Sequence, residues 1–72
     1  MARFRFLGSM AELAGTREKE IALERPTRLG ELFPMPFPSG RTVILVNERP
    51  GDLDDLIRDD DEVLFMQVLS GG

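Results

Sequence analysis

Four residue types that carry much of protein chemistry are missing from this 72-residue chain: cysteine, histidine, tyrosine and tryptophan. Without cysteine there can be no disulfide, no thiolate zinc site, no iron–sulfur cluster and no thiol nucleophile. Without histidine the chain lacks the side chain most used for proton transfer near neutral pH, which is also the commonest metal ligand. The composition argues against a catalytic centre and a bound metal, and it predicts that stability comes from packing alone.

Positive charge is also scarce. The chain has 9 Lys and Arg against 13 Asp and Glu, a net charge of −4, and no basic cluster of the kind that neutralises phosphates in nucleic-acid binders. No apolar run approaches the roughly 20 residues of a membrane span, and the first residues lack the apolar region of a signal peptide. We expect one small cytoplasmic domain that binds neither nucleic acid nor a membrane.

Strand-like patterns are present in four stretches: residues 2–7, 17–24, 41–47 and 62–69. In the first, Ala2, Phe4 and Phe6 alternate with Arg3 and Arg5, which predicts apolar side chains facing the core and arginines facing out. So few residues separate the first two stretches that adjacent antiparallel strands are expected. The third is apolar on both faces, as in a strand that is covered on both sides or presents one face to a partner.

A short helix is predicted after the first strand. Ser9 and Glu12 have the spacing of a capping box, Met10 and Leu13 share one helical face, and Gly15 is placed to end the helix.

A second, brief helix is predicted over residues 26–33. Its core-facing residues are Leu29, Leu32 and Phe33.

The alternation of proline with large apolar residues over 34–38 favours an extended segment held to the core by Met35 and Phe37. An exposed proline-rich ligand for an aromatic groove is the alternative.

The acidic triplet Asp59-Asp60-Asp61 follows residues 52–57, which have the pattern of one helical turn or a short strand. Three carboxylates in a row invite a metal interpretation, but the alternating ligands and glycine of a calcium loop are absent. A solvated turn before the last strand is the favoured interpretation.

The apolar run of the last strand leads into Ser70-Gly71-Gly72. Two glycines in series allow the backbone to enter a channel too narrow for side chains. We therefore expect residues 1–69 to form the domain and residues 70–72 to form a flexible tail that another protein grasps. The alternative is an ordinary frayed end.

The last strand also predicts a partner surface. If Val63 and Phe65 face the core, the opposite face carries apolar side chains that would bind a partner, with arginines at their border. These interface residues are Leu64, Met66, Val68, Arg3 and Arg5. If the alternation is reversed, the apolar members of this set fill the core instead.

The order of these elements, together with several short motifs, resembles the ubiquitin-like β-grasp sulfur carriers, and in particular the small subunit of molybdopterin synthase (MoaD). The matching segments are Met10-Ala11-Glu12-Leu13-Ala14-Gly15-Thr16, Leu45-Val46-Asn47, Asp61-Glu62-Val63 and Ser70-Gly71-Gly72. The resemblance implies an α+β fold, with a mixed sheet of four to five strands and one main helix packed on one face.

The resemblance also implies a function without a catalytic group in this chain. A ubiquitin-activating-type adenylyltransferase (MoeB-like) would adenylate the Gly72 carboxylate with its own ATP and magnesium, and a sulfur donor would convert the product to a thiocarboxylate. The large subunit of molybdopterin synthase (MoaE-like) would then accept the tail and pass the sulfur to a pterin precursor. A carrier of the thiamine pathway (ThiS), a protein modifier joined to lysines and a plain β-grasp binding module remain alternatives.

Overall fold

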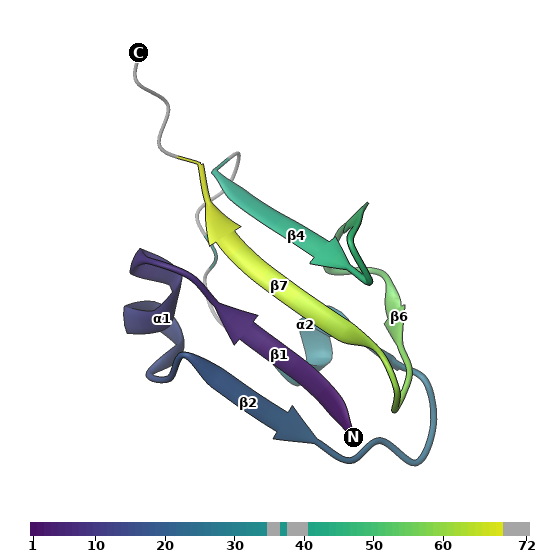
Figure 1. Ribbon diagram of the computed structural model, residues 1–72. Coiled ribbons are helices and arrows are strands. Elements are labelled where there is room, and N and C mark those ends of the chain that lie inside the picture. The colour runs from purple at the N-terminus through teal and green to yellow at the C-terminus, as the bar shows by residue number, and fades with distance from the viewer. Residues whose placement is uncertain (35–36, 38–40, 69–72) are drawn as a thin grey trace.

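Five strands form one mixed sheet in the order β2-β1-β7-β4-β5 (Figure 1). The computed structural model describes residues 1–34, 37 and 41–68. The strands are β1 (Ala2–Phe6), β2 (Glu18–Ile21), β4 (Thr42–Val46), β5 (Arg49–Gly51) and β7 (Glu62–Gln67). Two helices and a two-stranded sheet complete the described part of the fold: α1 (Ser9–Ala14), α2 (Leu29–Leu32), β3 (Thr27–Arg28) and β6 (Leu56–Ile57).

The two central strands, β1 and β7, are parallel, whereas β1–β2, β4–β7 and β4–β5 are antiparallel. The first and last strands of the described chain therefore lie side by side in the middle of the sheet. The antiparallel pairing of the first two strands confirms the sequence prediction, as does the mixed five-stranded sheet. Helix α2 lies across one face of the sheet, and the other face is seen in front in Figure 1.

The core lies between this sheet and α2 and is built around an aromatic cluster. Phe4 and Phe6 of β1 and Phe65 of β7 are at most 2% exposed. The ring of Phe33, just after α2, meets them edge-on with centroid distances of 4.7, 5.4 and 5.6 Å. Burying each such side chain stabilises the fold by about 1.5–3 kcal/mol. The aromatic centre of the core is therefore formed by inward-facing residues of β1 and β7 together with Phe33, the residue after α2.

Helix α1 differs from its prediction at two positions. The N-cap is Gly8, with φ 57°, and Ser9 lies inside the helix with its hydroxyl bonded to Gln67, so no capping box forms. Leu13 is 41% exposed, and Met10 is the buried residue of the helix. The positive φ of Gly8 turns the chain sharply out of β1 and so starts the helix one residue early. Gly15 ends the helix, as predicted, and adopts the left-handed conformation.

The second helix, α2, starts later than predicted. Thr27 and Arg28 pair with Ile57 and Leu56 in the small antiparallel sheet, so the helix begins only at Leu29. The core-facing pattern was nevertheless correct. Leu29 and Phe33 are buried, and Leu32 packs against them from a partly buried position.

Phe37 packs against the core as predicted, with its ring stacked on that of Phe65 at a centroid distance of 5.3 Å. Met35, for which the same role was predicted, lies outside the described residues. The predicted boundary between domain and tail also falls there, because residues 69–72 are not described.

The acidic triplet lies in a turn between β6 and β7, and two of its carboxylates bind backbone N–H groups. Asp59 accepts a hydrogen bond from the N–H of Leu23 at 2.8 Å, and Asp61 accepts one from the N–H of Arg58 at 2.7 Å. These bonds close the loops at one end of the sheet.

Within the ranges that the structure describes, no helix is long and apolar enough to span a bilayer.

Candidate docking face

The parity of β7 decides which of its side chains are available to a partner. Val63 and Phe65 are at most 2% exposed and point toward α2, so Leu64 and Met66 lie on the opposite, outer face of the sheet because side chains alternate along a strand. Both are half-buried by their neighbours. Gln67 has the inward parity and lies at the edge of the core, where the Ser9 hydroxyl donates to its side-chain oxygen.

The neighbouring strands extend this outer face. Val43 and Leu45 of β4 pair with Met66 and Leu64, so they share the same side of the sheet. Leu7 continues the outward parity of β1 beside β7, since its N–H donates to the Phe65 carbonyl, and it is 42% exposed. We call the following set the apolar face: Leu7, Val43, Leu45, Leu64, Met66 and, just beyond β7, the exposed Val68.

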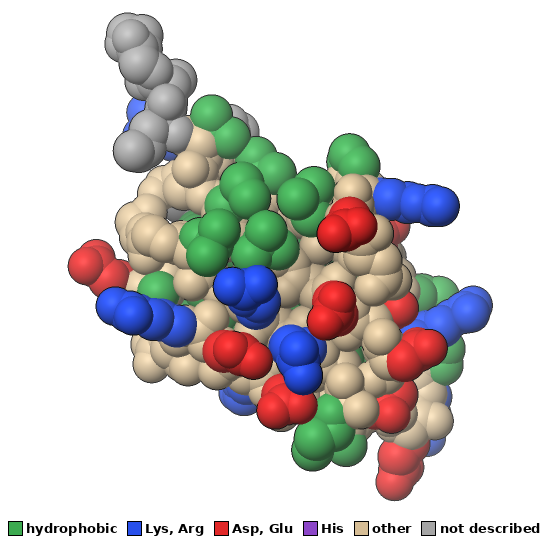
Figure 2. Space-filling view, viewed as in Figure 1, with side chains coloured by type: hydrophobic (Ala, Val, Ile, Leu, Met, Phe, Trp, Pro, Cys, Tyr) green, Lys and Arg blue, Asp and Glu red, His purple; other side chains and the backbone are tan. Residues whose placement is uncertain are grey.

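Hydrophobic side chains gather in one group on this side of the molecule, with charged side chains around and below them (Figure 2). Such a group on a small domain commonly marks a protein-binding surface. Leu7 was missing from the interface residues predicted from the sequence. The signal was present, because the period of two in β1 continues for one residue beyond Phe6.

The two arginines predicted at the border differ in their surroundings. Arg3 is held between two carboxylates, with its Nε 3.7 Å from Glu18 and its Nη1 3.6 Å from Glu62. Arg5, one outward position further along β1, has no ion pair within the described residues. All of these side chains are exposed, and exposed pairs of this kind stabilise a fold by only about 0–1 kcal/mol. Their contribution is therefore to the charge pattern of the face.

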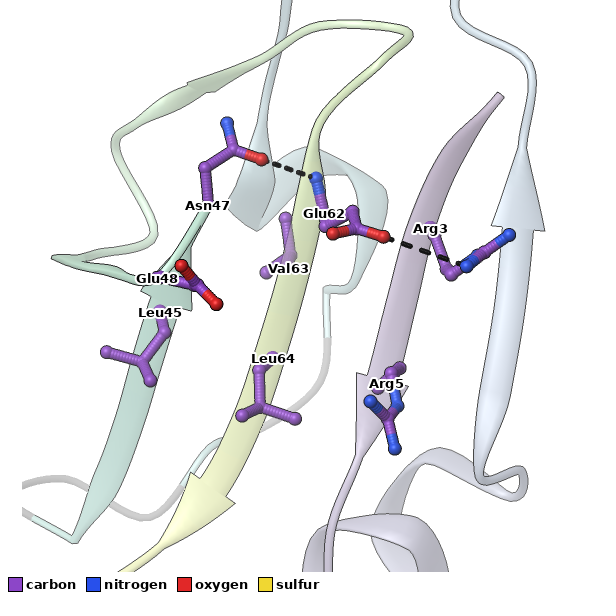
Figure 3. A pocket seen from close by; sticks show the side chains of 8 residues that line it. All are labelled: Arg3, Arg5, Leu45, Asn47, Glu48, Glu62, Val63 and Leu64. Atoms are coloured by element: carbon purple, nitrogen blue, oxygen red, sulfur yellow. Dashed lines mark hydrogen bonds and ion pairs between the residues drawn. The ribbon is translucent and has the colours of Figure 1, made fainter.

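A hollow of about 210 Å³ lies where the apolar face meets its charged border. In Figure 3, Leu64 lies on β7 between Leu45 on one side and Arg5 on the other, with Glu48 on the β4 side. Apolar walls and ionisable groups of both signs therefore meet in one shallow depression. It can receive a protruding side chain of a partner but is small for an enclosed ligand site.

The root of the tail is fixed from two sides. The N–H of Val68 donates to the carbonyl of Arg41 at 2.7 Å, which carries the β4–β7 pairing past the end of β7. On the other side Ser9 of α1 holds Gln67. The predicted tail residues lie outside the described residues. These are Ser70, Gly71 and Gly72.

The described groups with shifted pKa values lie outside the apolar face. The N–H of Leu23 bonds the Asp59 carboxylate and lowers the pKa of Asp59, and the nearby N-terminal ammonium acts in the same direction. The Asp54 carboxylate accepts a hydrogen bond from Arg28 and raises the pKa of Arg28 further.

The only lysine, Lys19, extends its ammonium over the ring of Phe33 at 5.9 Å, on the helix-covered side of the sheet.

The order of the sheet, its parallel central pair and the helix on one face define a ubiquitin-like β-grasp domain. The model of the ThiS family matches residues 4–72. The chain therefore belongs to the ThiS family.

Solved structures show the same fold at low sequence identity. Small archaeal modifier protein 1 from Haloferax volcanii is 17% identical, with a TM-score of 0.76 over 99% of this chain and 98% of that chain. A protein from Pyrococcus furiosus assigned as molybdopterin converting factor, subunit 1, is 23% identical, with a TM-score of 0.72 over 94% and 97%. Small archaeal modifier protein 1 from Methanosarcina acetivorans is 19% identical, with a TM-score of 0.65 over 99% and 95%. No curated protein sequence matches the chain.

Proposed function

We propose that this chain is the sulfur carrier of a molybdopterin synthase. The observation that carries the proposal is the continuity of the apolar face with the strand that leads to the glycine pair. Met66 lies on the last outward position of β7, and Ser70-Gly71-Gly72 follows only four residues later in the sequence. A partner docked on this face would sit beside the root of the tail.

Four residues separate Val68 from the end of Gly72, and a fully extended chain covers at most about 3.3–3.6 Å per residue. If the Gly72 carboxylate is the reacting group, as proposed, it would lie at most about 14 Å from Val68. Because Val68 is bonded to Arg41, this distance is measured from a fixed point of the domain. The partner's reacting centre would have to lie within about 14 Å of Val68 when the partner is docked.

The carboxylate of Gly72 would be the reacting group. A free α-carboxylate has a pKa of about 3.3–3.7, is ionised at neutral pH and is a poor acyl donor. A ubiquitin-activating-type enzyme, using ATP and magnesium, would join it to AMP with release of pyrophosphate. A sulfur donor would then displace AMP, and the thiocarboxylate would pass its sulfur to a pterin precursor in the large synthase subunit. The chain contributes the reacting atom and its delivery, and partners contribute the catalytic groups.

The choice of molybdopterin as the destination is supported by the motifs over residues 10–16, 45–47, 61–63 and 70–72 and by the name of the Pyrococcus furiosus structure. The thiamine-pathway carrier shares the proposed chemistry and differs only in its sulfur acceptor.

A second candidate function is conjugation to other proteins, which the similarity to the archaeal modifier proteins favours. Gly72 would then form an amide with a lysine of a target. Chains linked through lysine side chains could grow only from Lys19, because no other lysine is present.

Reconstitution separates these functions. The chain is incubated with the adenylating enzyme of its own organism, ATP, magnesium and a sulfide source, and the product is then offered in parallel to a molybdopterin synthase large subunit with its pterin precursor, to a thiazole synthase and to a cell extract. A variant that ends at Gly71 is the control. The proposal predicts that, of the three acceptors, only the large subunit receives sulfur and forms the dithiolene. Sulfur transfer only to thiazole synthase, or Gly-Gly-type remnants on lysines with no sulfur transfer, would replace it by one of the alternatives.

A further inference from the structure

On the outer face of the sheet, Arg5 is a charged residue beside apolar neighbours. It is paired with Leu64 of β7, and Leu64 is paired with Leu45 of β4, so the three residues lie side by side across the sheet. The next row toward the tail is apolar, with Met66 opposite Val43. A partner that covers the apolar face therefore also covers the guanidinium of Arg5.

The carboxylates of the domain itself leave Arg5 without a counter-charge. Glu18 is the cross-strand partner of Arg5 on β2, but its carboxylate turns to Arg3 instead. Glu62 also pairs with Arg3. Over the described ranges no carboxylate lies within ion-pair distance of Arg5, whereas Arg3 has two.

Glu48, the other carboxylate of the hollow, stands on its far side. It follows β4, and β7 with Leu64 runs between it and Arg5 (Figure 3). The backbones of two strands that flank a third are about 10 Å apart. Glu48 forms no ion pair with Arg5 in the described structure, so Arg5 remains without a counter-charge on the β1 side of the hollow.

We propose that Arg5 selects the adenylating enzyme as a partner by binding a carboxylate on its docking surface. The docking surface of that partner would be apolar where it meets Leu64 and Met66, and it would present one Asp or Glu side chain to the β1 side of the hollow. This inference rests on the proposed function, because it requires that a partner docks on the apolar face. It adds the chemistry of the residue that the partner must bring.

The physical reason is the cost of covering a cation. An exposed guanidinium is solvated, but under an apolar partner surface it loses water and must be paired. A carboxylate matches the planar fork of arginine with two parallel hydrogen bonds. Pairing at Arg5 would therefore favour surfaces with a carboxylate at that point and reject surfaces that are apolar throughout.

The test measures binding to the purified adenylating enzyme by titration calorimetry, with five forms of the chain: wild type, Arg5→Met, Arg5→Glu, Arg28→Met and Met66→Arg. Arg5→Met keeps the apolar stem and removes the charge. Arg28→Met removes the same charge from β3, away from the hollow, and is the matched control. Circular dichroism of each variant confirms that it is folded.

The proposal expects Arg5→Met to weaken binding by about tenfold or more, Arg5→Glu to weaken it further and Arg28→Met to leave it within about twofold. If Met66→Arg weakens binding while Arg5→Met binds as tightly as wild type or more tightly, the docking face stands and the role of Arg5 is overturned. If Met66→Arg binds like wild type, the docking face itself is wrong, and the inference about Arg5 is overturned with it.

Discussion

Asn47 and Glu62 are joined by two hydrogen bonds between the end of β4 and the start of β7. The N–H of Asn47 donates to the carbonyl of Glu62 at 2.8 Å, and the N–H of Glu62 donates to Asn47 Oδ1 at 2.9 Å. Asn47 Nδ2 also donates to Asp61 Oδ1 at 2.8 Å. A slip of one residue between paired strands would turn every side chain to the other face, so this clamp holds the parity that turns Leu64 and Met66 outward.

The clamp makes Asn47 a sensitive position. Its φ of 51° is left-handed, which costs an alanine roughly 1–2 kcal/mol, and each side-chain hydrogen bond contributes about 0.5–1.5 kcal/mol. We expect Asn47→Ala to lower the free energy of unfolding by about 2–5 kcal/mol in urea titrations. Asn47→Gly removes the side-chain bonds but tolerates the backbone, so it should lose about 1–2 kcal/mol less. Equal losses for both variants would show that the backbone conformation is unimportant.

Alternation in β7 gives a second prediction. Met66→Arg changes an outward side chain and should alter stability by no more than about 0.5 kcal/mol, while partner binding is lost because a charge enters the apolar face. Phe65→Ala, at the neighbouring inward position, should cost about 3–5 kcal/mol. Thermal or urea unfolding of the two variants checks the contrast. A large destabilisation by Met66→Arg would place Met66 in the core.

The sheet and much of the core could be predicted from the sequence because they follow from short-range alternation. The period of two in residues 2–6 identified the buried phenylalanines of β1, and the spacing of Leu29 and Phe33 identified the helical side of the core. The outward set on β7 was predicted as one of two possible parities. Packing, which no local pattern encodes, selects between the two.

Other features depend on long-range contacts and were missed. The predicted cap of α1 does not form because the helix starts one residue early, and the Ser9 hydroxyl instead bonds to Gln67, a residue 58 positions away. The start of α2 is shortened because Thr27 and Arg28 pair with β6. The unpaired state of Arg5 depends on which of two arginines Glu18 binds, and a sequence pattern gives no preference between them.

Asp59 gives a prediction for pH. Its pKa is lowered by the hydrogen bond from the N–H of Leu23 and by the N-terminal ammonium, so its folded pKa lies below the unfolded one. A depressed carboxylate pKa stabilises the fold above the unfolded value of about 3.9, and this stabilisation is lost as the pH falls through the folded pKa. Asp59→Asn mimics the protonated form. The Tm difference between wild type and Asp59→Asn should be largest above about pH 5 and shrink below pH 4. A difference independent of pH would contradict the shift.

The most direct test of the central claim is the intact mass of the protein purified from its own cells, compared with a variant that lacks Gly72. A carrier predicts a wild-type species heavier by the difference between sulfur and oxygen, which sensitivity to a thiocarboxylate-selective reagent would confirm, and no such species in the variant. A wild-type protein found only at its unmodified mass, under conditions in which the cells make molybdopterin, would contradict the account.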